Sequence, residues 1–238
     1  MNVTGFSEGL DRFSEDLDFS LLKPSTSFKL ERFTPSVEEE LLAFGFNVKV
    51  EMVDKSVVTP VQSAFLKANT RSDLLVIETD DNLAGQITPG QTLKVKIEVD
   101  SDPPSDFSTE TRYLLQPIPF SVRCYELPDL FAGKMHALLC RTWKNRVKGR
   151  DWYDFVWYAA NHPRLHLSHL EQRMRQTGHW KGDDPLTQPE FKEILNSSIE
   201  KLDVHQAQND VAPFVRDRQL IEIWSQDFFR DLARRIQF

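Results

Sequence analysis

Two aspartates separated by one residue are the first feature of this sequence that could do chemistry. They are Asp16 and Asp18, within the run Arg12-Phe-Ser-Glu-Asp-Leu-Asp-Phe19. If this run is a strand, both carboxylates lie on one face, roughly 7 Å apart along the backbone. Such carboxylates repel each other unless a cation lies between them, and oxygen ligands suit Mg²⁺ or Mn²⁺ better than zinc. The pair predicts a divalent metal site, although Asp-x-Asp also occurs on exposed strands and turns.

A third carboxylate, Glu98, lies on a predicted strand whose polar face also carries Lys94, Lys96 and Asp100. Next to the strand of the two aspartates, Glu98 would complete a three-carboxylate cluster. Such a cluster can hold divalent ions that bind both the attacking and the leaving oxygen of a phosphoryl transfer. Alternating charges are also typical of any exposed strand face, so Glu98 indicates a metal site only together with the aspartates.

Two more candidate residues, Lys134 and Asp151, lie on predicted helices. Lys134 is on or beside an apolar stripe, so its amine either reaches solvent or projects into a cleft and pairs with an anion. In a cleft it could bind a nucleotide phosphate or stabilise charge on the transferred group. Asp151 either charges the first turn of its helix or orients Lys134 or a substrate hydroxyl.

Charge is distributed unevenly along the chain. Residues 1–130 carry 12 Lys and Arg against 22 Asp and Glu, whereas residues 131–238 carry 17 against 14. Between positions 134 and 150 there is no acidic residue, and the basic residues are Lys134, Arg141, Lys144, Arg146, Lys148 and Arg150. An acidic half could hold metal and a basic segment could hold polyphosphate, or the basic segment is a solvated loop between two helices.

Composition and missing motifs exclude several classes of protein. The 238 residues are 40% hydrophobic and 27% charged, which is typical of a folded protein, and no apolar run approaches the ~20 residues of a membrane-spanning helix. The first residues do not resemble a secretory leader, and with only Cys124 and Cys140 a disulfide framework or a four-cysteine zinc site is excluded. We expect a cytoplasmic protein. His162, His166 and His169 have metal-like spacing, but a solvated loop is the favoured interpretation.

Hydrophobic periodicity predicts strands first and helices afterwards. Period-2 or apolar runs predict strands at 17–22, 47–53, 73–79, 93–99 and 120–125, with one helix at 37–44. From Pro128 onward the period becomes helical, with helices expected around 130–139 and 152–159 and near 168–176, 188–202 and 217–236. We therefore expect an α/β (α+β) protein with a mixed β-sheet core at 1–127 and a helical region at 128–238.

Four segments in order resemble the AbiEii/AbiGii toxin family of nucleotidyltransferases, within the DNA polymerase β-like nucleotidyltransferase superfamily. They are Arg12–Phe19, Lys96–Asp100, Ala132–Ala137 and Lys148–Asp154, and the similarity runs from about Asp11 to Tyr158. The resemblance implies a nucleotidyltransferase-like mixed sheet and Mg²⁺-dependent transfer of a nucleotide from a nucleoside triphosphate. In characterised toxins of this family the acceptor is the 3′ end of transfer RNA, and many members are toxins of two-gene systems that limit phage infection, beside a cognate antitoxin.

The resemblance also implies a role for each matched residue. Asp16, Asp18 and Glu98 would hold metal, Lys134 and Asp151 would be catalytic, and Arg12, Ser14 and Lys96 would bind the nucleotide. The basic residues that would guide the RNA acceptor are Arg141, Lys144, Arg146, Lys148 and Arg150. One departure concerns the Gly-Gly-Ser/Thr motif that the family carries upstream of Asp-x-Asp, because the residues before Asp16 contain no such motif.

We therefore predict an enzyme that transfers a nucleotide to an RNA or protein acceptor. The departure at the glycine motif motivates an alternative, a catalytically degenerate remnant that binds a nucleotide or a partner protein. A metal-dependent nuclease ranks lowest, because nucleases commonly place a lysine two residues after a carboxylate, whereas Lys96 precedes Glu98.

Overall fold

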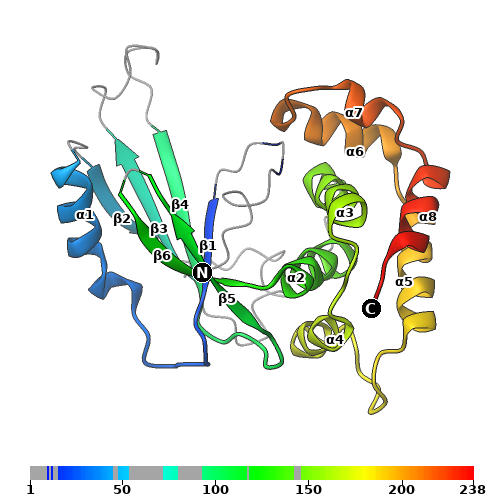
Figure 1. Ribbon diagram of the computed structural model, residues 1–238, viewed down its shortest axis with the longest axis horizontal. Helices are drawn as coiled ribbons and strands as arrows, with labels where there is room; N and C mark the ends of the chain where they lie inside the picture. The colour runs from blue at the N-terminus through cyan, green and yellow to red at the C-terminus, as the bar shows by residue number, and fades with distance from the viewer. Residues whose placement is uncertain are drawn as a thin grey trace. The chain divides into compact units, whose positions relative to one another are not determined.

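The computed structural model describes residues 10, 12, 16–44, 48–53, 72–79, 93–116, 118–141 and 146–238. The chain divides into two compact units. Unit 1 contains residues 1–3 and 15–103, and unit 2 contains residues 4–14 and 104–238. Figure 1 labels the helices and strands of both units. The predicted class is confirmed, since the described residues form mixed α and β structure.

Unit 1 is built on a sheet with the strand order β1-β4-β3-β2. Its strands are β1 (Asp16–Ser20), β2 (Val48–Val53), β3 (Ser72–Thr79) and β4 (Leu93–Asp100). β1 runs parallel to β4, and the two other pairs are antiparallel. The first and fourth strands in the chain thus become neighbours, which brings two sequence motifs about 80 residues apart into hydrogen-bonded register.

A small apolar core lies on one face of the β1–β4 pair. Ile97 and Val99 of β4 are buried there, and Leu17 and Phe19 of β1 pack against the same cluster. Leu30, in the short helix η1 (Leu30–Arg32), and the amphipathic α1 (Thr34–Ala43) add to this core. Because successive residues of a strand face opposite sides, burial of the odd-numbered residues directs Asp18 and Glu98 to the other face.

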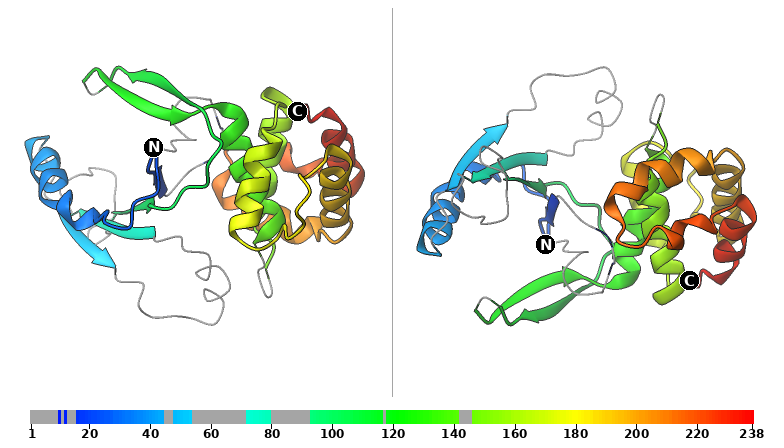
Figure 2. Two further views of the ribbon diagram at one scale, coloured as in Figure 1. Left: turned by 90° about the horizontal axis from the view of Figure 1, so that it is seen from below. Right: turned by 90° about the horizontal axis from the view of Figure 1, so that it is seen from above.

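Unit 2 combines a hairpin with a group of helices. The hairpin strands are β5 (Thr109–Leu114) and β6 (Phe120–Tyr125). The helices are α2 (Leu127–Cys140), α3 (Gly149–Asn161), α4 (Leu167–Gln176), α5 (Gln188–Glu200), α6 (Val204–Val211), η3 (Ala212–Phe214), α7 (Gln219–Glu222) and α8 (Gln226–Arg235). α2 packs on α3 and α4, α3 packs on α6 and α8, and α5 packs on α8, as both views of Figure 2 show for the last pair.

Aromatic side chains fill the core of unit 2. The rings of Phe131 on α2 and Tyr158 on α3 stack with centroids 4.9 Å apart, and both side chains are buried. Trp152 of α3 meets Phe229 of α8 edge to face, also with centroids 4.9 Å apart. Tyr125, at the end of β6, belongs to the same core, so the hairpin is part of the helical unit. These contacts fix α3 between α2 and α8, and with it the residues at its first turn.

The predicted strands and most predicted helices are confirmed within a few residues, and the differences are local. The helix predicted at 217–236 is interrupted, because Ser225 caps α8 by accepting a hydrogen bond from the backbone N–H of Phe228. β5 and α6 were not predicted. Among the helices of the described ranges, none is both long and apolar enough to cross a membrane.

Candidate functional site

Two carboxylates of unit 1 occupy paired positions on neighbouring parallel strands. Asp18 of β1 is in register with Glu98 of β4, and Asp16 is in register with Lys96. Neighbouring strands lie about 4.8 Å apart, so Asp18 and Glu98 leave the sheet side by side on the face opposite the apolar core. Asp18 is exposed and Glu98 is half-buried. Like charges placed this closely on a sheet are unfavourable unless a cation or a proton offsets them.

The donor set fits a hard divalent cation. Carboxylate oxygens are the ligands that Mg²⁺ prefers, and the site offers them from two adjacent backbone segments. The next acidic residue of β4, Asp100, has a different use, because its Oδ1 accepts a hydrogen bond of 3.0 Å from the backbone N–H of Asp102. Asp18 and Glu98 are a described pair whose positions suit a metal, with Asp16 two residues before Asp18 on the backbone of β1.

Unit 2 contains a buried carboxylate between two cations. Asp154 of α3 is almost wholly buried, and it accepts hydrogen bonds from Nε and Nη2 of Arg12 at 2.6 Å and 2.7 Å. Nζ of Lys134 on α2 lies 2.9 Å from Oδ2 of the same carboxylate. Such a two-pronged Arg–carboxylate contact fixes both groups in orientation. The triad joins the segment around Arg12 to α2 and α3, and it holds the amine of Lys134 in place.

The two cations keep Asp154 ionised in the interior. Burial by itself raises the pKa of a carboxyl group, but the charges of Lys134 and Arg12 and their hydrogen bonds outweigh this effect, so that the pKa of Asp154 is lowered below its ordinary value. Burial likewise opposes the charge of Arg12, and the contact with Asp154 raises the pKa of Arg12 above its ordinary value. The charges of Arg12 and Asp154 therefore stabilise each other.

Asp151 has a different partner from the one considered in the sequence analysis. The carboxylate that contacts Lys134 is that of Asp154, whereas Oδ1 of Asp151 lies 4.0 Å from Nζ of Lys148. Asp151 and Asp154 lie on one side of α3, one turn apart. The side chains of Trp152, Phe155 and Tyr158 on the same helix are buried in the core. Asp154, which contacts Lys134, is the more deeply buried of the two aspartates.

Positive charge is concentrated around Lys148. Burial lowers the pKa of Lys148, the carboxylate of Asp151 opposes this, and the charges of Arg141, Arg150 and Lys134 lower the pKa further. Several cations gather around Lys148 and Asp151, so an added anion would be attracted here. The arrangement suits a phosphate group.

Other residues of the basic segment contact the protein itself. Arg146 donates from Nε to Oδ1 of Asp210 at 2.6 Å, and the guanidinium of Arg150 lies 4.2 Å from the ring centroid of Phe214. Arg141 is exposed. Lys144 and Ser14 lie outside the described residues, and of Asp16 and Lys96 we describe only the backbone.

Gly149 allows the first turn of α3 to approach α6 closely. A Cβ atom on Gly149 would lie 2.0 Å from the backbone oxygen of Ala207, a distance that real side chains do not adopt. The backbone N–H of Gly149 donates to Oδ2 of Asp210 at 2.9 Å, which adds a second link between the two helices. The glycine in the run Lys148–Asp151 is thus required by packing, and it places the basic residues beside α6.

One comparison with known proteins identifies the family of the chain. A family model described as nucleotidyl transferase AbiEii toxin, type IV TA system, matches residues 7–233. The chain belongs to the AbiEii family. A search of curated proteins finds no match for this chain. The AbiEii match confirms the resemblance carried by four short segments, and it extends beyond Tyr158 through the C-terminal helices. Membership implies a nucleotidyltransferase toxin of a type IV toxin–antitoxin system.

In this AbiEii chain, sequence reasoning missed Asp154 as a partner of Lys134. A usable signal existed, because Asp154 lies on the apolar stripe of α3 with Phe155 and Tyr158, and a carboxylate at such a position needs a buried cation. The solvated loop predicted for the histidines is wrong for His169, whereas His162 and His166 lie in the segment between α3 and α4. His169 is fully buried and accepts a hydrogen bond of 3.0 Å from Nε of Arg173, and His166 bonds through Nδ1 to the buried Asp129.

Proposed function

We propose that this AbiEii chain is a Mg²⁺-dependent nucleotidyltransferase that moves a nucleotide from a nucleoside triphosphate to an RNA, of the transfer RNA type, or to a protein acceptor. It would act as the toxin of a phage-defence pair with a cognate antitoxin. The observation that carries the proposal is the parallel register of Asp18 with Glu98, which pairs two carboxylates from motifs about 80 residues apart.

Asp16, Asp18 and Glu98 would hold the metal. When bound, Mg²⁺ would draw negative charge from the phosphoryl oxygens and so make the α-phosphorus easier to attack. The protein's own part is to supply oxygen ligands from two strands that hydrogen bonds and a buried apolar face keep in register. Mn²⁺ has the same ligand preference and would be expected to substitute.

Lys134 would bind a phosphate of the triphosphate. An ammonium group has three N–H donors, and Asp154 is the partner that the described structure gives it, so donors remain for a ligand. Asp154 acts as a positioning residue, because it fixes the direction of the amine without touching substrate. Lys148 and its neighbouring cations would add attraction for the polyphosphate. Arg12, Ser14 and Lys96 would complete the contacts to the nucleotide.

Asp151 would receive the proton of the acceptor hydroxyl, or hold that hydroxyl in place. Its carboxylate is nearly buried, and its Oδ1 lies 4.0 Å from Nζ of Lys148. Of the basic segment, Arg141, Lys144 and Arg146 are the residues best suited to contact RNA phosphates, together with Lys148 and Arg150 at its base. The ion pair of Arg146 with Asp210 would then compete with the acceptor.

The test is transfer of label from each α-labelled nucleoside triphosphate, with total RNA and Mg²⁺, by the purified chain. Wild-type protein should label RNA or protein, whereas Asp16→Ala and Glu98→Gln should lose at least about 100-fold in rate because the metal ligands are removed. Glu39→Gln, which changes an exposed carboxylate of α1, is the matched control and should keep full activity.

The outcomes separate the competing functions. Full transfer by Asp16→Ala would overturn the metal assignment. Binding of a triphosphate with no transfer would favour the degenerate remnant, and cleavage of RNA with no incorporated label would favour a nuclease. If only one of the four triphosphates is incorporated, the same experiment names the nucleotide.

A further inference from the structure

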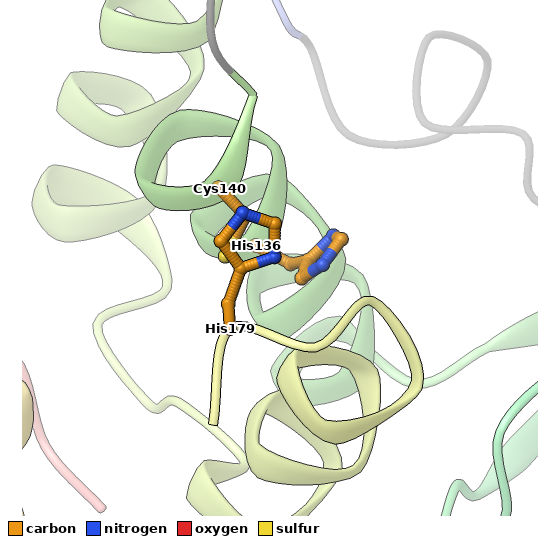
Figure 3. A group of neighbouring side chains, drawn as sticks. All are labelled: His136, Cys140 and His179. Carbon is orange, nitrogen blue, oxygen red and sulfur yellow. The ribbon is translucent and has the colours of Figure 1, made fainter. Parts of the chain in front are cut away.

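A second group of metal-ligating side chains lies on the other side of α2 from Lys134. His136 and Cys140 occupy α2 one turn apart, and His179 follows the end of α4. Figure 3 shows the ring of His179 brought against α2 at these two residues. The ligand atoms of the three side chains all lie within 4.8 Å of one another. Lys134 contacts α3, so this group is separate from the candidate nucleotide site.

The spacing is close to that of a tetrahedral zinc centre. Zn²⁺ binds imidazole nitrogen at about 2.0–2.1 Å and thiolate sulfur at about 2.3 Å, which sets neighbouring ligand atoms roughly 3.3–3.6 Å apart. A closure of roughly 1 Å therefore completes the site. His179 is exposed and lies beyond the last turn of α4, so its side chain can make this movement without disturbing the core. His136 and Cys140 are held by their helix.

Hydrogen bonds already hold both imidazoles in a form suited to a metal. Oγ1 of Thr177 lies 2.9 Å from Nε2 of His136 and 2.9 Å from Nδ1 of His179. The same hydroxyl lies 3.1 Å from the backbone oxygen of Arg173 and 3.3 Å from that of Met174. When it donates its one proton to either carbonyl, it can accept an N–H from each imidazole, and each ring then keeps one nitrogen lone pair. Metal-bound histidines usually have such a partner for the second ring nitrogen.

We propose that His136, Cys140 and His179 form a Zn²⁺ site with three protein ligands and a fourth position open to water. On binding, a Zn–S bond forms, the S–H bond of Cys140 breaks, and the proton goes to solvent; no electron is transferred. The metal links the C-terminal end of α2 to the segment after α4. This site is independent of nucleotide transfer, and its failure would leave the proposed function untouched.

The test uses Co²⁺ as a spectroscopic probe with the full chain, after treatment with chelator and reductant. One equivalent of Co²⁺ should produce a thiolate-to-cobalt charge-transfer band and the visible bands of tetrahedral cobalt, and Zn²⁺ should displace them. His179→Ala should weaken Zn²⁺ binding by at least roughly 10–100-fold, because removal of a hydrogen-bond partner of a metal ligand already has an effect of that size and His179 is itself a proposed ligand. Because His179 is exposed, this variant should keep the circular dichroism of wild type.

Two matched controls make the result specific. Cys124 is the other buried cysteine and lies on β6, so Cys124→Ser should keep the charge-transfer band that Cys140→Ser loses. His205 is an exposed histidine on α6, and His205→Ala should bind Zn²⁺ like wild type. No stoichiometric binding by wild type, or binding that Cys140→Ser and His179→Ala leave unchanged, would overturn the proposal.

Discussion

Replacing Asp154 by asparagine tests whether the buried triad stabilises the fold as its geometry indicates. The substitution keeps the shape of the side chain and removes its charge, which leaves the cations of Arg12 and Lys134 without their shared carboxylate. Arg12 has 7% of its side chain exposed and Lys134 has 22%, so solvent can replace little of the lost interaction. Breaking a buried ion pair by removing one partner costs about 3–5 kcal/mol.

We expect Asp154→Asn to lower the free energy of unfolding by about 3–5 kcal/mol, against a total of about 5–15 kcal/mol for a typical folded protein. Urea denaturation at pH 7 measures this as a lower midpoint with an unchanged m value. Asp231→Asn is the matched control, because Asp231 pairs with Arg235 on the surface at 2.9 Å and the pair should contribute about 0–1 kcal/mol. Lys134→Met should cost less than Asp154→Asn, since Arg12 keeps its partner.

The pH dependence gives a second readout. The folded-state pKa of Asp154 is lowered, so its contribution to stability is complete above the ordinary carboxyl pKa of about 3.9 and is lost as the pH falls through the folded-state value. The stability difference between wild type and Asp154→Asn should therefore shrink only below pH ~4. A loss no larger than that of Asp231→Asn, or a difference that does not change in acid, would refute the reasoning.

Three further predictions concern packing, pH and capping. Gly149→Ala should destabilise the protein by about 1–3 kcal/mol or more in urea denaturation, because the added methyl group would overlap the backbone of Ala207. In the control Gly133→Ala, the methyl group meets only a flexible side chain at 3.8 Å, so this variant should be neutral or stabilising. Equal effects of the two substitutions would contradict this prediction. The pKa of His136 is lowered to about 3 in the folded state, so the stability of the wild type should decline as the pH falls from about 6.5. His136→Gln should make that decline smaller when the free energy of unfolding is measured at pH 7, 5.5 and 4.5. Thr187→Ala removes the side-chain cap of α5 and should cost about 1 kcal/mol by thermal unfolding, with an unchanged melting temperature as the contrary result.

Local patterns in the sequence were sufficient for every described strand except β5, and for one half of the candidate site. The alternation of apolar and charged residues in Leu93–Asp100 predicts a strand with one buried face, and it puts Glu98 on the other face. The same reasoning applies to Asp18 between Leu17 and Phe19. The family resemblance grouped the carboxylates of these two strands in one site, and the strand register shows that Asp18 and Glu98 are neighbours.

Helix breaks and short elements were harder to predict, since they depend on single side chains or on packing. One serine, Ser225, separates α7 from α8 by capping the latter. The sequence around Gly149 does not show that glycine is required there. The requirement comes from the close approach of Ala207 on α6, which lies far along the chain. The close contact between these helices is a property of their packing, and periodicity within either helix does not contain it.

The sequence alone determined the class of fold and most of the strands, because these rest on short-range patterns set by backbone geometry. Its four motifs determined the family resemblance and the residues proposed to hold metal. Only the tertiary structure decided that Asp154, and not Asp151, contacts Lys134, since both carboxylates share one side of α3 and the choice depends on how α2 packs against it. It alone joined His179 to His136 and Cys140, because contact between α2 and α4 brings together residues that no spacing in the sequence connects.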